Sequence, residues 1–297
     1  MQLALLFFGL LRLVGYGSEP LLAGRDIHQA VGEPTRVGVG LLRPDNLRVV
    51  SWNIARGTQF DQVRDVLAGL DADVYILQEV DWACRRSGDR SIASDLADAL
   101  NLNWVFAGEF QEIGEGRPGR FALTGQAILS RYPIDEISVL RFERQAALRW
   151  NLDPFQPRRG GRIALRARSG GVVIYNAHIE SARDDRFRAR QVSEILADHV
   201  RKPDSAAPLI LAGDLNTGSA RRSPVVESII GAGLTDALGE YSESRKTSVR
   251  HPQPLDWIFV KSLEAREGRV SDNGKASDHF PLWATLTIPS LRAAVAR

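Results

Sequence analysis

The sequence of 297 residues contains a single cysteine, Cys84, and only five histidines. One cysteine excludes an internal disulfide. The net charge is only +2, so the composition does not indicate a nucleic-acid or acidic-membrane partner. The apolar run over 3–11 is too short to span a bilayer, which takes about 20 apolar residues. Repeats and low-complexity tracts are also lacking, which leaves an ordinary globular protein as the expectation.

Length and composition suit one large α/β domain or two small ones, with 44% hydrophobic and 25% charged residues. We expect residues 1–46 to form a leader and linker, 47–289 to form one domain, and 290–297 to form a tail. The run over 3–11 resembles the core of a secretory signal, although no basic residue precedes it. A wrongly assigned start codon or an edge helix would also explain it. The protein is thus expected to be exported or membrane-proximal if the run is a signal, and otherwise cytoplasmic.

The stretch Leu209–Thr217 is the part of the sequence to which the other predicted site residues are related below. It begins as an apolar run typical of a buried strand and ends in Gly-Asp-Leu-Asn. Alternate side chains of an extended segment point the same way, so Asp214 and Asn216 should share a face. A carboxylate and an amide there suit a hydrated cation and a phosphate oxygen. The alternative is a simple turn, since these residue types also favour turns.

The first part of the domain has the pattern of a strand–helix–strand unit. A strand over 47–53 ends at Asn53, a helix is predicted over 60–70, and a second strand over 73–80 carries Glu79. Such a unit implies two parallel strands. A carboxylate at the end of a buried strand needs a partner, which could be a ligand or simply Arg85 or Arg86.

Further polar side chains fall at predicted strand ends. The strand over 171–181 carries His178, the strand over 255–260 begins with Asp256, and Ser277-Asp278-His279 precedes the last strand, over 281–288. The remaining predicted elements are strands over 104–110, 125–130 and 162–168, and helices over 92–100, 187–200 and 225–230. Strand ends at one edge of an α/β sheet form a common floor on which ligands bind.

The residue types on this floor indicate a metal and acid–base chemistry. Glu79, Asp214 and Asp278 offer oxygen ligands, and the shortage of cysteine and histidine favours Mg²⁺ or Mn²⁺ over structural zinc. His178 and His279 are the two histidines on these motifs. An imidazole oriented by a carboxylate can act as a general base or as a donor in the transition state, and Asp256 is the candidate that orients His279.

The segment over 141–168 is rich in arginine. A solvated surface explains such a run, and an anion-facing rim is the functional alternative. Arg162 is the best placed for substrate binding, because it opens the predicted strand over 162–168.

Seven short motifs now occur in one order, and together they resemble the endonuclease/exonuclease/phosphatase superfamily, which includes deoxyribonuclease I. They are SWN (51–53), LQEV (77–80), GQAILSRYPI (125–134), YNAHIES (175–181), LAGDLN (211–216), LDWIFV (255–260) and SDHFPL (277–282). The resemblance covers about residues 47–289. It implies a four-layer α/β sandwich, with two mixed β-sheets flanked by helices.

The resemblance also implies residue roles. Glu79 resembles the family's metal-binding glutamate, Asn53 the asparagine near the metal and the phosphate, and His178 the histidine that contacts the scissile phosphate. Asp214 and Asn216 resemble the pair that positions the water and a phosphate oxygen, and Asp278 resembles an acid that binds the metal or lies next to its ligands. His279 resembles the catalytic histidine, and Asp256 the acid that orients it. The histidine in YNAHIES resembles the deoxyribonuclease, sphingomyelinase and phosphatase branches more than the apurinic-site nucleases.

The expected function is a divalent-metal-dependent phosphoester hydrolase, a phosphodiesterase acting on nucleic acid or a phospholipid headgroup through in-line attack of water. The alternative is a non-catalytic module on the same fold that binds a phosphorylated ligand or a partner. No obligate protein partner is indicated by the sequence.

Overall fold

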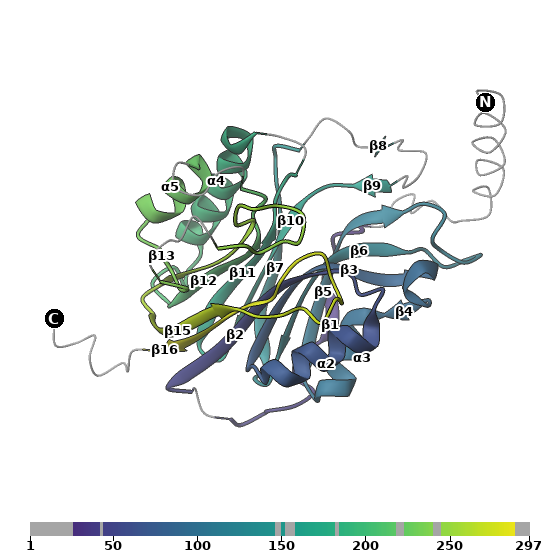
Figure 1. Ribbon diagram of the computed structural model, residues 1–297, viewed down its shortest axis with the longest axis horizontal. Coiled ribbons are helices and arrows are strands. Elements are labelled where there is room, and N and C mark those ends of the chain that lie inside the picture. Colours follow the sequence, from purple (N-terminus) through teal and green to yellow (C-terminus); the bar gives the residue numbers. More distant parts are fainter. Residues whose placement is uncertain are drawn as a thin grey trace.

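The strands of the computed structural model form two mixed sheets (Figure 1). The structure describes residues 26–41, 44–145, 150–151, 158–181, 184–217, 223–239 and 245–288. The predicted N-terminal apolar run and the predicted tail over 290–297 lie outside these residues.

The larger sheet has the order β15-β16-β2-β3-β6-β5-β9-β8, with β1 paired to β5 and β4 paired to β3. Its strands are β1 (Val31–Glu33), β2 (Asn46–Arg56), β3 (Val74–Cys84), β4 (Arg90–Ser91), β5 (Asn103–Glu112), β6 (Leu123–Ser130), β8 (Trp150–Asn151), β9 (Arg158–Gly160), β15 (Glu264–Val270) and β16 (Leu282–Thr287).

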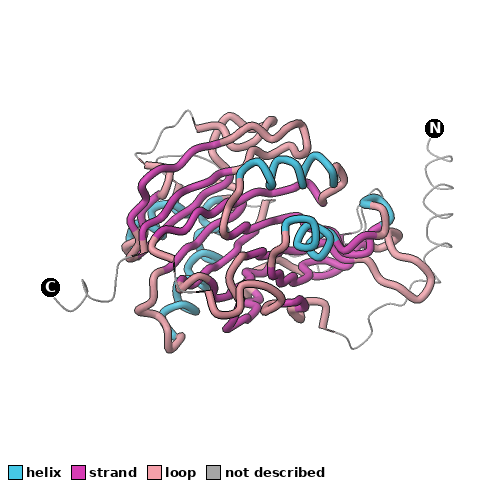
Figure 2. Tube along the Cα trace, turned by 90° about the horizontal axis from the view of Figure 1, so that it is seen from below, coloured by secondary structure: helices cyan, strands magenta, loops and turns pink. Residues whose placement is uncertain are grey.

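The smaller sheet has the order β13-β14-β12-β11-β10-β7. Its strands are β7 (Ile134–Arg141), β10 (Ile163–Ser169), β11 (Val172–His178), β12 (Leu209–Asp214), β13 (Thr235–Asp236) and β14 (Asp256–Lys261). Figure 2 shows the strands and helices from below.

Helices cover the outer face of each sheet, so the expected four-layer sandwich is confirmed. Helices α2 (Phe60–Leu70) and α3 (Ile92–Leu100) pack on the larger sheet, and α4 (Asp185–Arg201) and α5 (Pro224–Gly231) pack on the smaller one. A third apolar cluster lies between the sheets, with Ile76 of β3 and Ile174 of β11 among its members. A short 3₁₀ helix, η2 (Arg85–Ser87), follows β3. None of the described helices has the length and apolar character needed to cross a membrane.

The predicted strand–helix–strand unit is present, and β2 and β3 are parallel, as expected. The helices predicted over 60–70 and 92–100 have those bounds. The predicted leader and linker differs from expectation in one respect: its residues 31–33 form β1, which pairs with β5.

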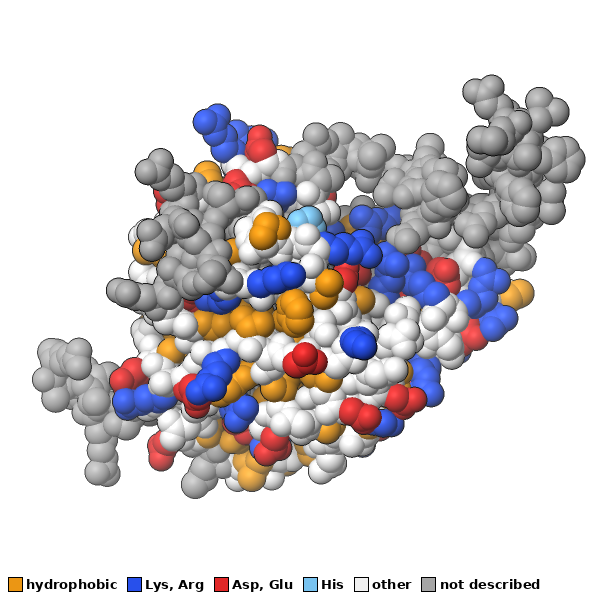
Figure 3. All heavy atoms as spheres, in the orientation of Figure 1, with side chains coloured by type: hydrophobic (Ala, Val, Ile, Leu, Met, Phe, Trp, Pro, Cys, Tyr) orange, Lys and Arg blue, Asp and Glu red, His pale blue; other side chains and the backbone are white. Residues whose placement is uncertain are grey.

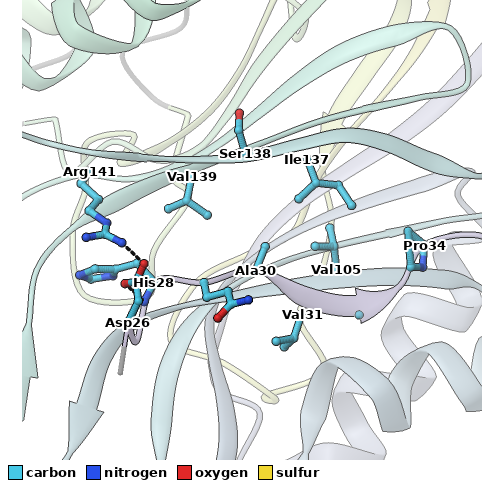
Figure 4. Close-up of a pocket in the computed structure, with 12 residues that line it drawn as sticks. Asp26, His28, Ala30, Val31, Pro34, Val105, Ile137, Ser138, Val139 and Arg141 are labelled. Carbon is cyan, nitrogen blue, oxygen red and sulfur yellow. Dashed lines mark hydrogen bonds and ion pairs between the residues drawn. The ribbon is translucent and has the colours of Figure 1, made fainter. Parts of the chain in front are cut away.

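A cavity of about 510 Å³ opens between β1 and β7 (Figure 4). Its walls include Val31, Val105 and Ile137, and an ion pair between Asp26 and Arg141 lies at one end. None of the predicted site residues is among those that line it.

Candidate active site

The carboxylate of Asp214 lies at the centre of the predicted floor. Its Oδ2 accepts a hydrogen bond from Asn53 Nδ2 at 3.2 Å. The Nε2 atoms of His178 and His279 lie 3.6 Å and 3.8 Å from the same oxygen. One buried carboxylate oxygen therefore faces three polar side chains that come from distant parts of the chain.

The register of the smaller sheet explains why His178, Asp214 and Asp256 lie close together. His178 at the end of β11 is opposite Asp214 at the end of β12, and Asp214 is opposite Asp256 at the start of β14. These three strands are neighbours, so the three side chains start at the same level of the sheet. The larger sheet contributes Asn53 from β2, and the loop before β16 contributes His279.

An irregularity in two adjacent strands positions Glu79. The pairing of β3 with β6 shifts between Leu77 and Val80, and the pairing of β2 with β3 shifts between Asn53 and Arg56. Glu79 itself has a left-handed backbone, with φ of +49°. Such a bulge re-aims a side chain, and the Glu79 side chain is 31% exposed beside Arg56, with 3.8 Å between Oε2 and Nε.

The alternative that Glu79 only pairs with Arg85 or Arg86 is wrong. Arg86 forms a two-pronged ion pair with Asp81, with both N···O distances 2.8 Å, and Arg85 donates to the carbonyl of Gly114. Burial alone would raise the pKa of Glu79, but the neighbouring histidines and arginines outweigh it and lower that pKa to about 2. Those groups are His178, Arg56, Arg162 and His279. Glu79 is therefore an ionised, partly open carboxylate at neutral pH.

His279 is held by Asp256, as predicted. Its Nδ1 lies 2.9 Å from Asp256 Oδ2, and Asp256 is fully buried. Burial lowers the pKa of His279, but Asp256 and Asp214 outweigh this and raise it to about 10. The imidazolium therefore carries protons on both nitrogens at neutral pH, with Nε2 directed toward Asp214. Of the two roles left open for His279, this favours the donor.

His178 is held by a pair of residues, of which only Arg162 was predicted. Arg162 Nη1 lies 2.8 Å from His178 Nδ1 and 3.3 Å from Glu109 Oε2. Since a guanidinium only donates, Nδ1 of His178 accepts and Nε2 carries the proton. Arg162 is only 5% exposed, and it positions His178. Its predicted contact with substrate stays a prediction.

Glu109 was missed by sequence reasoning. It is fully buried and accepts a hydrogen bond from Gln126 at 2.9 Å. The pairing of β5 with β6 shifts between Gly108 and Phe110, so Glu109 sits at a bulge that turns it toward the site. An acid inside the apolar strand predicted over 104–110 was the available signal.

The two other predicted residues lie at the margin. The backbone N–H of Asn216 donates to Asp214 Oδ1 at 3.0 Å, and its side chain donates to the carbonyl of Ile179. The Asp278 side chain is 43% exposed and pairs with Arg250 at 3.9 Å. Its carboxylate has no recorded contact with Glu79 or Asp214 in the described part of the chain, so its metal role stays a prediction.

The donor set fits a hard divalent cation. Asp214, Asp256 and His279 each offer an atom within 4.8 Å of the others, so this triad has the spacing of a metal site, and His279 would have to release a proton to bind there. The ionised carboxylate of Glu79 lies nearby and is more open. The single thiol, Cys84, is buried in the core and takes no part.

The arginine-rich segment over 141–168 does not form one surface. Arg166 is buried in an ion pair with Asp204, and Arg168 pairs with Asp135 on the smaller sheet. Arg162 lies at the site, and Arg158 stacks on Phe110 beside it. Arg149 lies outside the described residues.

Comparisons with known proteins identify the family and the fold. A family model, described as the endonuclease/exonuclease/phosphatase family, matches residues 50–279. No protein with a curated function matches the sequence.

Solved structures of this family are similar in fold. An endonuclease/exonuclease/phosphatase from Beutenbergia cavernae is 20% identical, with a TM-score of 0.59, covering 83% of this chain and 72% of its own. The human Nocturnin catalytic domain with bound sulfate is 18% identical, with a TM-score of 0.59, covering 88% and 97%. A 3'-5' exonuclease from Neisseria meningitidis is 18% identical, with a TM-score of 0.54, covering 80% and 98%.

The match over residues 50–279 spans most of the chain, and the two-sheet sandwich is shared with these structures. The chain therefore belongs to the endonuclease/exonuclease/phosphatase family, whose members are mostly phosphoester-hydrolysing enzymes.

Proposed function

We propose that this protein is a divalent-metal-dependent phosphodiesterase that cleaves its substrate by in-line attack of water. The observation that carries the proposal is the position of Asp214 Oδ2 between the protonated Nε2 atoms of two histidines. Each histidine is held from behind by a different group, His178 by Arg162 and His279 by Asp256.

In this arrangement, different residues would stabilise the developing charge, take up the proton and orient the water. His178, His279 and the amide of Asn53 are donors aimed at one centre, where they would stabilise the charge that develops on a phosphoryl oxygen. Asp214 is the carboxylate at that centre, and in the complex it would take the proton of the attacking water. Asn216, whose backbone fixes the other oxygen of Asp214, would help to orient that water.

The proposed metal is Mg²⁺ or Mn²⁺, with Glu79 as its main protein ligand and Asn53 and Asp278 as the further predicted ligands. Bound there, it would neutralise a phosphoryl oxygen and the leaving oxygen. Glu79 is preferred over the triad of Asp214, Asp256 and His279, because Asp256 is fully buried and already engaged by His279.

The test is hydrolysis by the purified protein, with Mg²⁺, with Mn²⁺ and with EDTA. The substrates are supercoiled plasmid, sphingomyelin and bis(p-nitrophenyl) phosphate. We expect metal-dependent turnover of at least one, lost in Asp214→Asn, Glu79→Gln and His279→Ala while circular dichroism stays unchanged. The matched control is Asp65→Asn, an exposed carboxylate on α2.

Full activity of a folded Asp214→Asn protein would overturn the mechanism. A wild-type protein that binds phosphate compounds but hydrolyses none of them would favour the alternative, a non-catalytic binding module.

A further inference from the structure

Arg158 is a charged side chain beside the site that the proposed reaction does not use. It belongs to β9, where it lies opposite Glu112 of β5. Its guanidinium carbon lies 4.0 Å from the centroid of the Phe110 ring. Among the residues that the structure describes, none accepts a hydrogen bond from its guanidinium group. Its donors are therefore available to a ligand.

The neighbouring acids are already engaged. Glu109 accepts hydrogen bonds from Arg162 and Gln126, Glu112 lies 3.4 Å from Arg86, and Glu79 faces Arg56. Arg158 lies close enough to Glu112, Glu109 and Glu79 to feel their charge, yet it makes no ion pair with any of them.

Two guanidinium groups share one aromatic ring at this place. The guanidinium carbon of Arg162 lies 5.3 Å from the Phe110 ring centroid and that of Arg158 lies 4.0 Å from it. Burial and the charge of Arg162 both lower the pKa of Arg158, which shows how close the two charges are. A guanidinium nevertheless stays charged in proteins, so a further anion beside Arg158 would reduce the repulsion between the two groups.

Backbone contacts fix the position of β9 and therefore of Arg158. The N–H of Gly161 donates to the carbonyl of Glu109 at 3.0 Å. Gly160 has φ of +139°, and a Cβ there would lie 2.1 Å from the same carbonyl oxygen. Strand β9 therefore lies tightly against the β5 bulge that holds Glu109, so Arg158 is anchored in the same sheet as Glu109, Asn53 and Glu79. Figure 3 shows arginine and lysine side chains gathered on this side of the molecule, near the place of β9 in Figure 1.

We propose that Arg158, stacked on Phe110, forms a second anion subsite that binds a phosphate group adjacent to the scissile phosphodiester. This inference rests on the proposed function and narrows its substrate class. The guanidinium fork suits a phosphate oxygen pair. The substrate is then a diester that carries another phosphate nearby, as in an oligonucleotide or a phosphorylated polyol. A choline headgroup would instead place a cation beside Arg158, which disfavours sphingomyelin.

The kinetic test uses matched diesters with and without the second phosphate. They are TpT against pTpT and TpTp, and glycerophosphoinositol against its 4-phosphate, which separate the two sources of the phosphate. For at least one pair, we expect the wild type to show a kcat/KM about tenfold or more higher for the phosphorylated member, seen mainly in KM. Arg158→Gln should bring the ratio to about one, and Arg158→Lys should restore part of it. The control is Arg269→Gln, whose exposed side chain lies on β15.

A binding measurement separates failure of the subsite from failure of the proposed hydrolysis. Calorimetry in EDTA compares thymidine 3',5'-bisphosphate with thymidine 5'-monophosphate, which needs no turnover. Tighter binding of the bisphosphate by the wild type, lost in Arg158→Gln, supports the subsite even if no diester is cleaved. Equal binding of both nucleotides, or equal kinetic losses for both members of every pair in Arg158→Gln, would overturn it.

Discussion

Glu109 lies beside both His178 and Arg162, the residue that orients His178. It is fully buried, lies 3.3 Å from Arg162 and lies 3.5 Å from His178 Nδ1. Burial alone would raise the pKa of Glu109, but Arg162 and His178 outweigh it and lower the pKa. Glu109 is therefore ionised and compensates the buried charge of Arg162.

Glu109→Gln keeps the shape of the side chain and removes this charge. Because Arg162 is then left buried without its counter-charge, we expect a loss of about 3–5 kcal/mol in the free energy of unfolding. We also expect kcat to fall about 10²-fold or more, since His178 loses its fixed orientation. Urea denaturation and hydrolysis assays measure the two effects. Glu264→Gln, an exposed control on β15, should change neither, and wild-type activity in Glu109→Gln would contradict this role.

The strands and helices differ in how well their sequences predict them. Helix α2 has the expected bounds because its apolar residues recur at helical spacing and bury Val63 and Leu67. Strand β15 was not predicted, because its sequence EAREGRV places charged side chains on an exposed edge. The bulges at Glu79 and Glu109 could not be predicted from the sequence either, since each depends on pairing with strands that are distant in sequence.

Strand β12 depends on a glycine immediately before Asp214. Gly213 has φ of +142°, and a Cβ there would lie 1.9 Å from the carbonyl oxygen of Ala177 in β11. Gly213→Ala must therefore separate the two strands that place His178 and Asp214 side by side. We expect a loss of at least about 2 kcal/mol in the free energy of unfolding.

The comparison is Gly69→Ala in α2, where a Cβ would meet no atom within 4 Å. A glycine replaced by alanine inside a helix should add about 0.5–1 kcal/mol. The two substitutions are chemically identical and are predicted to have opposite signs in urea denaturation. A Gly213→Ala protein as stable as the wild type would refute the close strand contact.

Helix α4 carries a buried histidine that makes stability depend on pH. His199 packs edge-on against Tyr175, with 6.1 Å between the ring centroids, and burial lowers its pKa below the ordinary value of 6.5. The folded protein therefore holds His199 neutral where the unfolded chain would take up a proton. Its contribution to stability is complete above about pH 6.5 and is lost as the pH falls toward the lowered pKa.

His199→Leu should reduce this dependence. We expect the difference in unfolding free energy between pH 7.5 and pH 5.5 to be smaller in His199→Leu than in the wild type, by at most about 1.4 kcal/mol, because pH 5.5 lies only one unit below the ordinary pKa of 6.5. Urea denaturation at the two pH values measures it. His251→Leu, at an exposed position, is the control, and an unchanged pH difference in His199→Leu would disprove the assignment.

At the scale of the whole molecule, local patterns in the sequence do not predict the order of the strands. The last strand, β16, lies between β15 and β2, so the loop before it reaches the site beside the first strand of the domain. Trp52 Nε1 donates to the carbonyl of His279 at 2.9 Å, which joins residues 227 positions apart. Strand-end polarity indicated Asn53, His178 and Asp214, which the fold brings together, but it gave no sign of Glu109. Only the motif order indicated that two separate sheets would meet there.

The two sheets share one apolar core, and this predicts how the molecule unfolds. Ile76 of the larger sheet and Ile174 of the smaller sheet are both fully buried in the cluster between them. A polar contact also joins the two sheets, since Gln78 Nε2 donates to Asn176 Oδ1 at 2.8 Å. Neither sheet can expose its inner face without exposing that of the other, so unfolding should be a single cooperative transition.

Ile76→Ala and Ile174→Ala should therefore have the same kind of effect, although they lie in different sheets. Each should cost about 2–5 kcal/mol in unfolding free energy, because each leaves a cavity in the shared core. Circular dichroism and tryptophan fluorescence should report coincident urea transitions in both variants. Val200→Ala, at a 72% exposed position on α4, should change stability by less than about 0.5 kcal/mol. If Ile174→Ala shifted only one of two separable transitions, the sheets would be independent folding units, and the site between them would depend on docking rather than on a common core.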